Sequence, residues 1–196
     1  MVGLKKDLNI EYTYPEATFT EGSYRTVRDA ISDIQDIEPG KEVTDSYFTL
    51  PPHPEAQGLE KELRGRCLHN HITTATRETA LSRFKALKAG ENFHDLSPEL
   101  KTTYSNAERT QNTIYMRLKY DEPSGTVVNV RKSMWIHPEL DRAISIREAA
   151  RLQTFPDSFI FEGTKDSQYQ QVGNAVPPFL AKAVAESIIS ILDQTQ

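Results

Sequence analysis

The chain has 196 residues, of which 37% are hydrophobic and 26% are charged, and this composition suits one domain, or one domain plus a smaller lobe. The single cysteine, Cys67, excludes an internal disulfide. A net charge of −5 argues weakly against nucleic acid as a partner, but residues 61–117 hold ten Lys/Arg and six Asp/Glu, so a basic middle lies between acidic flanks.

The start of the chain lacks the pattern of a signal peptide, because no apolar core follows the lysines in MVGLKKDLNIEYTYPEATF. No apolar run in the sequence approaches the length of a membrane span. We therefore expect a cytoplasmic protein with no membrane partner.

Capping residues predict where the first helices begin. Thr26 followed by Asp29 is the pattern of a capping box. The stretch LPPHPEAQG, residues 50–58, is typical of a loop. Ser97 followed by Pro98 predicts the start of a helix.

The middle of the chain predicts one helix and two strands. Apolar residues at helical spacing in TRETALSRFKALKAG predict a helix that stops at Gly90. The stretch TIYMRLKYDEPSGTVVNV alternates and is rich in β-forming residues, so it predicts a strand, a turn at Pro123, Ser124 and Gly125, and a second strand.

Two further helices are predicted near the end. Ser145 with Glu148 is a capping box, and that helix should end before Pro156. The last helix should run over residues 178–192. Its predicted apolar face consists of Leu180, Val184, Ile188 and Ile191. Few residues of this chain are available to cover that face, so we expect part of it to be exposed or to be covered by another chain.

A tightly specified turn precedes the last helix. Gly173 allows a sharp approach of the backbone, Asn174 has a short amide that can bond backbone or ligand, and Pro178 presets the first helical turn. From these residues alone, an ordinary helix start is a better interpretation than a ligand site.

Several stretches together resemble the DNA cytosine-5 methyltransferases. DRAISIREAARLQTFPDSFIFEG and QYQQVGNAVPPFLAKAVAESI are similar to the last two sequence motifs of that family. YRTVRDAISDI and YMRLKYDEPSGTVVN resemble the beginning and end of its target recognition region, and MVGLKKDLNIEYTYPEATF resembles the strand and loop before it. The resemblance covers nearly the whole chain and is loosest at residues 45–115.

Other motifs of that family are missing. Its Phe-x-Gly-x-Gly turn binds S-adenosylmethionine and its Pro-Cys dipeptide supplies the nucleophile, but neither occurs here, and Cys67 lies in GRCLHN. Methyl transfer to C5 of cytosine needs that thiolate and a methyl donor beside a flipped base. The resemblance therefore implies the C-terminal part of such an enzyme, a fragment or small subunit that is inactive alone and partners double-stranded DNA and a catalytic lobe or subunit.

The fold implied is a mixed α/β (α+β) fold. It combines a small irregular recognition lobe of short strands and loops with a C-terminal helix that belongs with a missing Rossmann-like catalytic lobe. The expected divisions are residues 1–24 as the end of a catalytic-lobe strand and its loop, 25–140 as the target recognition region, and 141–196 as the C-terminal motifs. The resemblance also implies a prokaryotic, nucleoid-associated protein.

The resemblance assigns roles to individual residues. Asn174, Ala175 and Val176 would line the S-adenosylmethionine pocket, most of which belongs to the missing lobe. Thr126 and Val127 would face DNA near the target base. The basic candidates for phosphate and base contacts are Arg64, Arg66, Arg77, Arg83, Lys85, Lys88 and Arg117. The scaffold residues that would orient the recognition lobe are Arg147, Glu148 and Arg151.

Two alternatives stay open from the sequence. One is a non-catalytic, sequence-specific DNA-binding protein derived from a methyltransferase, and the other is an RNA-directed relative. The intact Gly-Asn-Ala-Val-Pro-Pro turn favours the methyltransferase, because its implied place is beside the methyl donor. No metal is expected, since His69 and His71 have no cysteine or carboxylate pattern around them.

Overall fold

The computed structural model describes the chain except residues 1, 4, 6–11, 46 and 194–196. It consists of two compact units, residues 25–175 and residues 1–24 with 176–196, which are described separately. Residues 141–175, which the sequence grouped with the final helix, pack within the larger unit. The strand expected at the start of the chain falls largely on residues outside those described.

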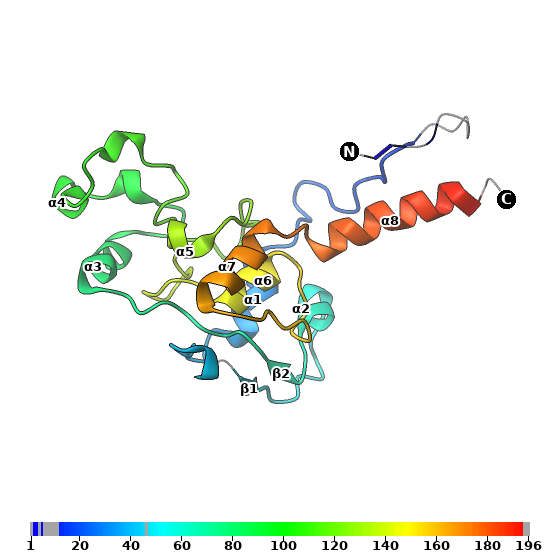
Figure 1. Cartoon of the computed structure of the whole chain (residues 1–196), viewed down its shortest axis with the longest axis horizontal. Helices are drawn as coiled ribbons and strands as arrows, with labels where there is room; N and C mark the ends of the chain where they lie inside the picture. Colours follow the sequence, from blue (N-terminus) through cyan, green and yellow to red (C-terminus); the bar gives the residue numbers. More distant parts are fainter. Residues whose placement is uncertain (1, 4, 6–11, 46, 194–196) are drawn as a thin grey trace. The chain divides into compact units, whose positions relative to one another are not determined.

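The larger unit is built from short elements (Figure 1). Its helices and 3-10 turns are α1 (Val27–Ile31), η2 (Ser32–Ile34), η3 (Val43–Asp45), α2 (Gly58–Leu63), α3 (Glu78–Ala86), η4 (Phe93–Asp95), α4 (Pro98–Lys101), η5 (Ala107–Arg109), α5 (Val130–Ser133), α6 (Ile146–Leu152) and α7 (Lys165–Asn174). Strands β1 (Phe48–Thr49) and β2 (Cys67–Leu68) pair antiparallel, with Phe48 opposite Leu68. The expected mixed content of helices and short strands is confirmed.

Both predicted capping boxes are present. The amide of Asp29 donates to the Thr26 hydroxyl, and the Asp29 carboxylate accepts from the Thr26 amide at 2.7 Å. Ser145 and Glu148 form the same reciprocal pair at the start of α6, at 3.0 and 2.7 Å. These local side-chain to backbone bonds satisfy amides that a helix start otherwise leaves unpaired.

The predicted strand pair at residues 113–130 is wrong. In place of a ladder with each other, its residues bond singly to separate segments. The amide of Tyr115 donates to Ser133, that of Arg117 to Glu91, and that of Leu118 to Ile136. The alternating pattern therefore reflects a buried, irregular crossing segment, since burial on one side favours the same residue types that a strand does.

The helix predicted up to Gly90 ends earlier, at Ala86. Gly90 lies beyond it, with φ of +88°, in a separate turn. The Arg117 guanidinium explains the early end, because it donates to the carbonyls of Phe84 at 2.6 Å and Leu87 at 2.8 Å. A buried cation thus bonds carbonyls at the end of α3, where the Phe84 carbonyl also accepts from the Leu87 amide at 3.2 Å.

Within the larger unit, α1, α6 and α7 pack together, whereas α3 and α4 contact each other at a separate end (Figure 1). The α3 end has its own apolar cluster. Its buried members are Ala80, Phe84, Leu87, Phe93, Leu96, Tyr115, Ile136 and Ala143. Ile136 and Ala143 come from the segment before α6, so this cluster is joined to the α6 side of the unit.

The smaller unit holds α8 (Pro178–Asp193), in which no residue is buried. The Tyr12 hydroxyl lies 2.7 Å from the Ser187 hydroxyl. An open apolar groove is lined by Tyr14, Pro15, Val176, Leu180, Ala181, Val184, Ala185 and Ile188. The expected exposure of the α8 apolar face is therefore confirmed.

One stretch among the described residues, Lys165–Asp193, has the length and apolarity of a membrane span. The expectation that no run approaches that size is wrong for this stretch. By length and composition alone it is weak evidence for a span. The helix is interrupted at residues 175–177, and the ion pair between Lys182 and Glu186 lies on its exposed surface.

Candidate functional site

Arg151 of α6 is a fully buried cation in the larger unit. Its guanidinium donates to both carboxylate oxygens of Asp157, at 2.8 and 2.6 Å, and to Asp33 and the Ala30 carbonyl. Burial alone would lower the pKa of Arg151, but the two carboxylates outweigh it and raise that pKa. The group stays charged and ties α1 to the segment after α6.

Arg147 lies on the same helix and is also fully buried. It donates to the backbone carbonyls of His69, Pro156 and Phe159, at 2.7, 2.9 and 2.6 Å, and to the Asn70 side chain at 3.2 Å. Burial is the main cause that lowers the pKa of Arg147, to about 10. Its planar set of donors joins two loops that lie far apart in the sequence.

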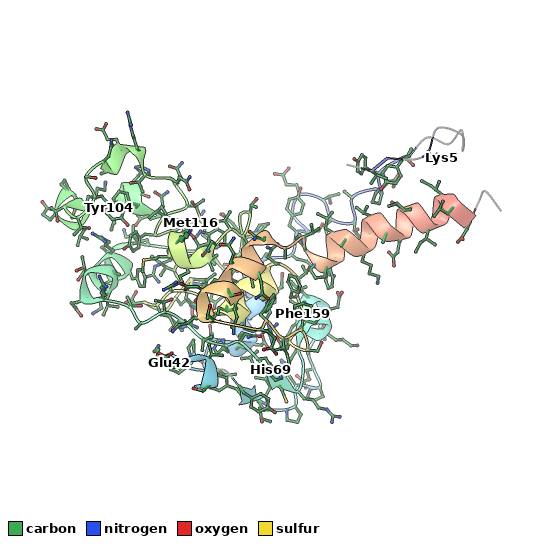
Figure 2. The ribbon with its side chains drawn as sticks, in the orientation of Figure 1. Lys5, Glu42, His69, Tyr104, Met116 and Phe159 are labelled. Carbon is green, nitrogen blue, oxygen red and sulfur yellow. The ribbon has the colours of Figure 1, made fainter. Side chains whose placement is uncertain are left out.

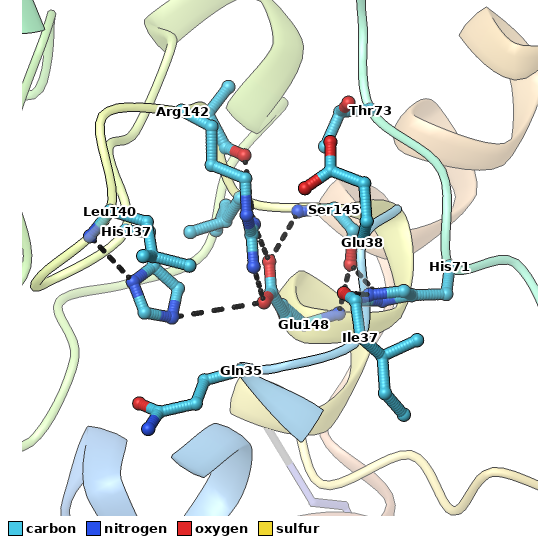
Figure 3. Close-up of polar contacts among 12 residues, drawn as sticks. Gln35, Ile37, Glu38, His71, Thr73, His137, Leu140, Arg142, Ser145 and Glu148 are labelled. Carbon is cyan, nitrogen blue, oxygen red and sulfur yellow. Dashed lines mark hydrogen bonds and ion pairs between the residues drawn. The ribbon is translucent and has the colours of Figure 1, made fainter. Parts of the chain in front are cut away.

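Glu148 completes the set of buried charges on α6 (Figure 3). Arg142 donates to its two oxygens at 2.7 Å each, and the Ser145 amide donates to it at 2.7 Å. Burial works to raise the pKa of Glu148, but Arg142 outweighs it and the pKa falls to about 2. We call Arg147, Glu148, Arg151 and their buried partners the α6 network.

Two buried histidines border Glu148 (Figure 3). The Nε2 of His71 lies 2.9 Å from the Ile37 carbonyl and must carry the proton, so its Nδ1 accepts from the Ser145 hydroxyl at 2.9 Å. Burial lowers the pKa of His71.

His137 has the same tautomer. Its Nδ1 accepts from the amide of Leu140 at 3.1 Å, and its Nε2 lies 3.3 Å from the Tyr120 hydroxyl and 4.0 Å from the Glu148 carboxylate. Burial is the largest cause that lowers the pKa of His137, to about 4, although Glu148 opposes it. Both imidazoles are therefore neutral near pH 7.

We expect the chain to lose stability as pH falls below about 6.5, the pKa of an unfolded histidine. Below that pH the unfolded state binds a proton at His137, whereas the folded state binds it only near pH 4. His137 therefore contributes about 3 kcal/mol to the free energy of unfolding above pH 6.5, and this contribution is lost between pH 6.5 and 4. Urea unfolding from pH 7.5 to 4.5 should show a smaller slope in His137→Gln. The exposed His94→Gln variant is the control, and an unchanged slope in His137→Gln would contradict the assignment.

A close backbone contact joins residues 126–129 to the last turn of α7. A Cβ on Gly173 would lie 2.8 Å from the Asn129 nitrogen and 2.8 Å from the Val128 carbonyl carbon. Only glycine permits this approach.

The predicted turn at Gly173 and Asn174 is wrong, because both residues belong to α7 and the irregular residues are 175–177.

Side-chain amides extend the same contact. Asn129 donates to Gln170 at 3.0 Å, and Gln170 donates to Asn174 at 2.7 Å. Arg131 pairs with Asp166 at the other end of α7. Thr126 and Asn174, which the sequence assigned to different ligands, are thus held on two segments that touch each other.

The residues predicted to contact DNA fall into an exposed group and a buried or covered group. The side chains of Thr126, Arg66, Arg77, Lys85 and Lys88 are exposed. Val127 is buried. Arg64 is mostly covered, pairs with Asp33 and donates to the Pro51 carbonyl at 3.0 Å.

Arg83 and Arg117 are buried and their donors are used inside the unit. Arg83 donates to the Leu100 carbonyl at 2.8 Å and to the Tyr115 hydroxyl at 3.0 Å. Arg117 donates to Phe84 and Leu87 and also to the His137 carbonyl at 3.0 Å. A basic residue between apolar neighbours in a sequence gives no sign of whether it is exposed.

Some residues of the site gave little signal in the sequence. Asn70 bonds the Phe161 amide and carbonyl and Gln168 of α7, across more than 90 residues. Helix α7 itself was missed because it is largely polar, although Thr164 accepts from the Ser167 amide as its cap and could have marked the start. Among the described residues, no group of three or more His, Cys, Asp or Glu side chains could hold a metal ion.

Comparisons with known proteins agree on one family. The model of the C-5 cytosine-specific DNA methylases matches residues 1–190. Type II methyltransferase M.DdeI of Desulfomicrobium norvegicum is 35% identical over 206 residues, which cover 95% of this chain and 48% of the relative. Type II methyltransferase M1.HphI of Haemophilus parahaemolyticus is 34% identical over 181 residues, which cover 92% of this chain and 40% of the relative.

A solved structure has the same fold. It is an E. coli protein described as a DNA modification methyltransferase encoded within a prophage, and it matches 97% of this chain and 53% of its own with a TM-score of 0.71 at 23% identity. The chain spans about half the length of these curated relatives.

Proposed function

The chain belongs to the C-5 cytosine-specific DNA methylases, and from this membership we propose that it chooses the DNA target and completes the methyl-donor pocket for S-adenosylmethionine-dependent methylation of cytosine in double-stranded DNA. The nucleophile and the glycine turn for the donor come from a catalytic lobe or subunit, since neither Pro-Cys nor Phe-x-Gly-x-Gly occurs in the sequence. The protein acts in the cytoplasm, at the nucleoid.

The observation that carries this proposal is the contact at Gly173. It holds residues 126–129 against the last turn of α7, which ends at Asn174. A base that is flipped out of a duplex must meet DNA-facing and donor-facing residues at one place. Thr126 on one segment and Asn174 on the other are suited to those two tasks, because both side chains are exposed.

The residues Asn174, Ala175 and Val176 fit the edge of the donor pocket. The Asn174 amide is exposed, and its oxygen accepts from Gln170. Its nitrogen donates to no other residue that the structure describes, so it is available to a ligand. Val176 is 63% exposed and offers an apolar surface. When bound, S-adenosylmethionine supplies the methyl group, and these three residues would bind and orient it beside the rest of the pocket.

We choose the residues that contact DNA by the exposure of their side chains. We assign phosphate contacts to Arg66, Arg77, Lys85 and Lys88. Arg83 and Arg117 are left out because they are buried and internally bonded, and Arg64 because Asp33 neutralises it. Thr126 faces the DNA near the target base while Val127 packs inward and anchors it.

The α6 network holds this set in place. Arg151 bonds to α1, and Arg147 bonds to the loop after β2 and to the segment before α7. Glu148 bonds to Arg142, in the segment before α6. Fixed side chains on rigid elements position a site better than loops alone do. We therefore propose that these three residues orient the recognition lobe without touching DNA.

We expect the purified chain to transfer no methyl group to DNA, and methylation to appear when a catalytic half is supplied. Incorporation of labelled methyl into duplex DNA measures this. Exchange of residues 60–130 for those of a relative with another target should move the methylated sequence with the exchanged segment. A target that stays with the catalytic half would overturn the recognition role, and no activity in any combination would favour a non-catalytic DNA-binding protein.

DNA binding by the chain should be modest and sensitive to salt. A few phosphate contacts predict a slope of log affinity against log salt of roughly −2 to −4. Replacing Lys85 and Lys88 together by alanine should reduce its magnitude by about 1 to 2 and weaken binding equally for every sequence. Fluorescence anisotropy from 25 to 200 mM salt, about the range in which such slopes are measured, gives both values. Lys182→Ala on α8 is the control, and an equal change there would argue against a specific role for the two lysines.

A further inference from the structure

An aromatic cluster anchors the segment that follows α4 in the larger unit. The ring of Tyr104, labelled in Figure 2, lies 4.4 Å from that of Phe93 and 6.5 Å from that of Tyr115 between ring centroids. The Arg83 guanidinium lies 5.2 Å from both tyrosine rings. Such contacts fix a segment whose backbone forms no strand and consists of turns, among them the 3-10 turn η5.

Residues 102–113, which we call the outer loop, are held at several points along their length. Arg83 donates to the Thr103 hydroxyl at 2.5 Å, and His94 donates to the Thr110 carbonyl at 2.7 Å. Ala107 packs against the apolar cluster of α3. The outer loop is therefore held to the rest of the unit at Thr103, Ala107 and Thr110, which are three or four residues apart.

Six side chains of the outer loop are exposed and polar: Ser105, Asn106, Glu108, Arg109, Gln111 and Asn112. In the part of the chain that the structure describes, none of the six makes a side-chain hydrogen bond or ion pair with another residue. Their hydrogen-bonding capacity is free for a partner.

The composition of this surface indicates what the partner is. Asn and Gln can bond adenine with two hydrogen bonds, and Arg can do so with guanine, in the major groove. Glu108 balances Arg109, so the six side chains have no net charge and would not form a phosphate clamp. They include no aromatic or large apolar side chain, which a protein interface would place at its centre.

We propose that the outer loop reads base edges in the major groove, with Asn106, Gln111 and Asn112 selecting adenine and Arg109 selecting guanine. This rests on the proposed function, in which the chain binds duplex DNA, and adds the element that sets the sequence choice. The lysines Lys85 and Lys88 of the neighbouring α3 segment would position the duplex, and the outer loop would specify its sequence.

Selection of bound duplexes from a randomised pool tests this proposal. The chain, its triple variant Asn106→Ala, Gln111→Ala, Asn112→Ala, and the control Gln57→Ala with Ser158→Ala are each equilibrated with the pool, and the bound fractions are sequenced. All five substituted side chains are exposed and uncharged. The triple variant should lose discrimination by about tenfold at one or more adenine positions. Its total DNA binding should stay within about threefold, because phosphate contacts are unchanged.

The outcomes separate the two proposals. An enriched sequence that is the same for the chain and the triple variant overturns the role of the outer loop and leaves the proposed function standing. DNA binding without any enriched sequence also overturns that role. No binding to any duplex at low salt overturns both proposals, and circular dichroism of the triple variant confirms that it is folded in each case.

Discussion

Replacing Arg151 by alanine will cost about 3 to 5 kcal/mol of unfolding free energy, which is a large part of the roughly 5 to 15 kcal/mol that keeps a domain folded. The substitution leaves the Asp157 carboxylate buried without its main cation. An uncompensated buried charge is more costly than the loss of an ordinary hydrogen bond. Urea unfolding followed by circular dichroism measures the effect, and a loss below about 1 kcal/mol would contradict it.

Two further variants separate charge from packing. The double variant Arg151→Leu, Asp157→Leu removes both members of the pair and should recover part of the loss, since Asp33 keeps Arg64 as a partner. Lys119→Ala is the matched surface control, because its pair with Glu122 is about half exposed. That control should change stability by less than about 1 kcal/mol.

Replacing Gly173 by alanine will separate residues 126–129 from α7. The new Cβ would lie 2.8 Å from backbone atoms of Val128 and Asn129, and neither backbone can move aside without moving the whole segment. We expect a stability loss of about 1 to 3 kcal/mol from overpacking. In an enzyme reconstituted with a catalytic half, the methylation rate should fall about 100-fold, as for a displacement of about 1 Å at a site.

Gly125 offers the matched control for this second substitution. The nearest atom to its added Cβ would be a Trp135 ring carbon at 4.0 Å, which is an ordinary contact. Gly125→Ala should therefore change stability by less than about 0.5 kcal/mol and leave the methylation rate within about threefold. Equal effects at both glycines would mean that the contact with α7 has no special role.

The sequence predicted those elements whose signal is local. The capping boxes at Thr26 and Ser145 need residues only three positions apart, and both are present. The segment at residues 113–130 was misassigned because its partners, Glu91, Ser133 and Ile136, could not be recognised without the fold. Alternation of apolar and polar residues indicates that one side of a segment is buried, and an irregular segment can bury one side as a strand does.

The candidate site shows the same division. Motif resemblance was enough to select Asn174, Ala175, Val176 and Thr126 as candidates. It could not tell which of the basic candidates for DNA contact are exposed, because the exposure of a cation depends on contacts between distant segments. Arg83 and Lys85 are two positions apart, and one is buried under Tyr104 and Tyr115 while the other is exposed. The sequence indicated that Gly173 allows a close backbone approach, but its partners, Val128 and Asn129, could not be recognised without the fold.

The α6 network has a consequence for the order in which this chain can fold during synthesis. Arg151 bonds to the Ala30 carbonyl, 121 positions earlier in the sequence, and Asn70 bonds to Phe161, 91 positions later. At about 5 to 20 residues per second, the ribosome needs roughly 6 to 24 seconds between α1 and its buried partner. Through that interval α1, with Val27, Ala30 and Ile31 facing inward, can pack against α2 but not yet against α6. The larger unit therefore cannot complete its packing around α1 until α6 leaves the ribosome.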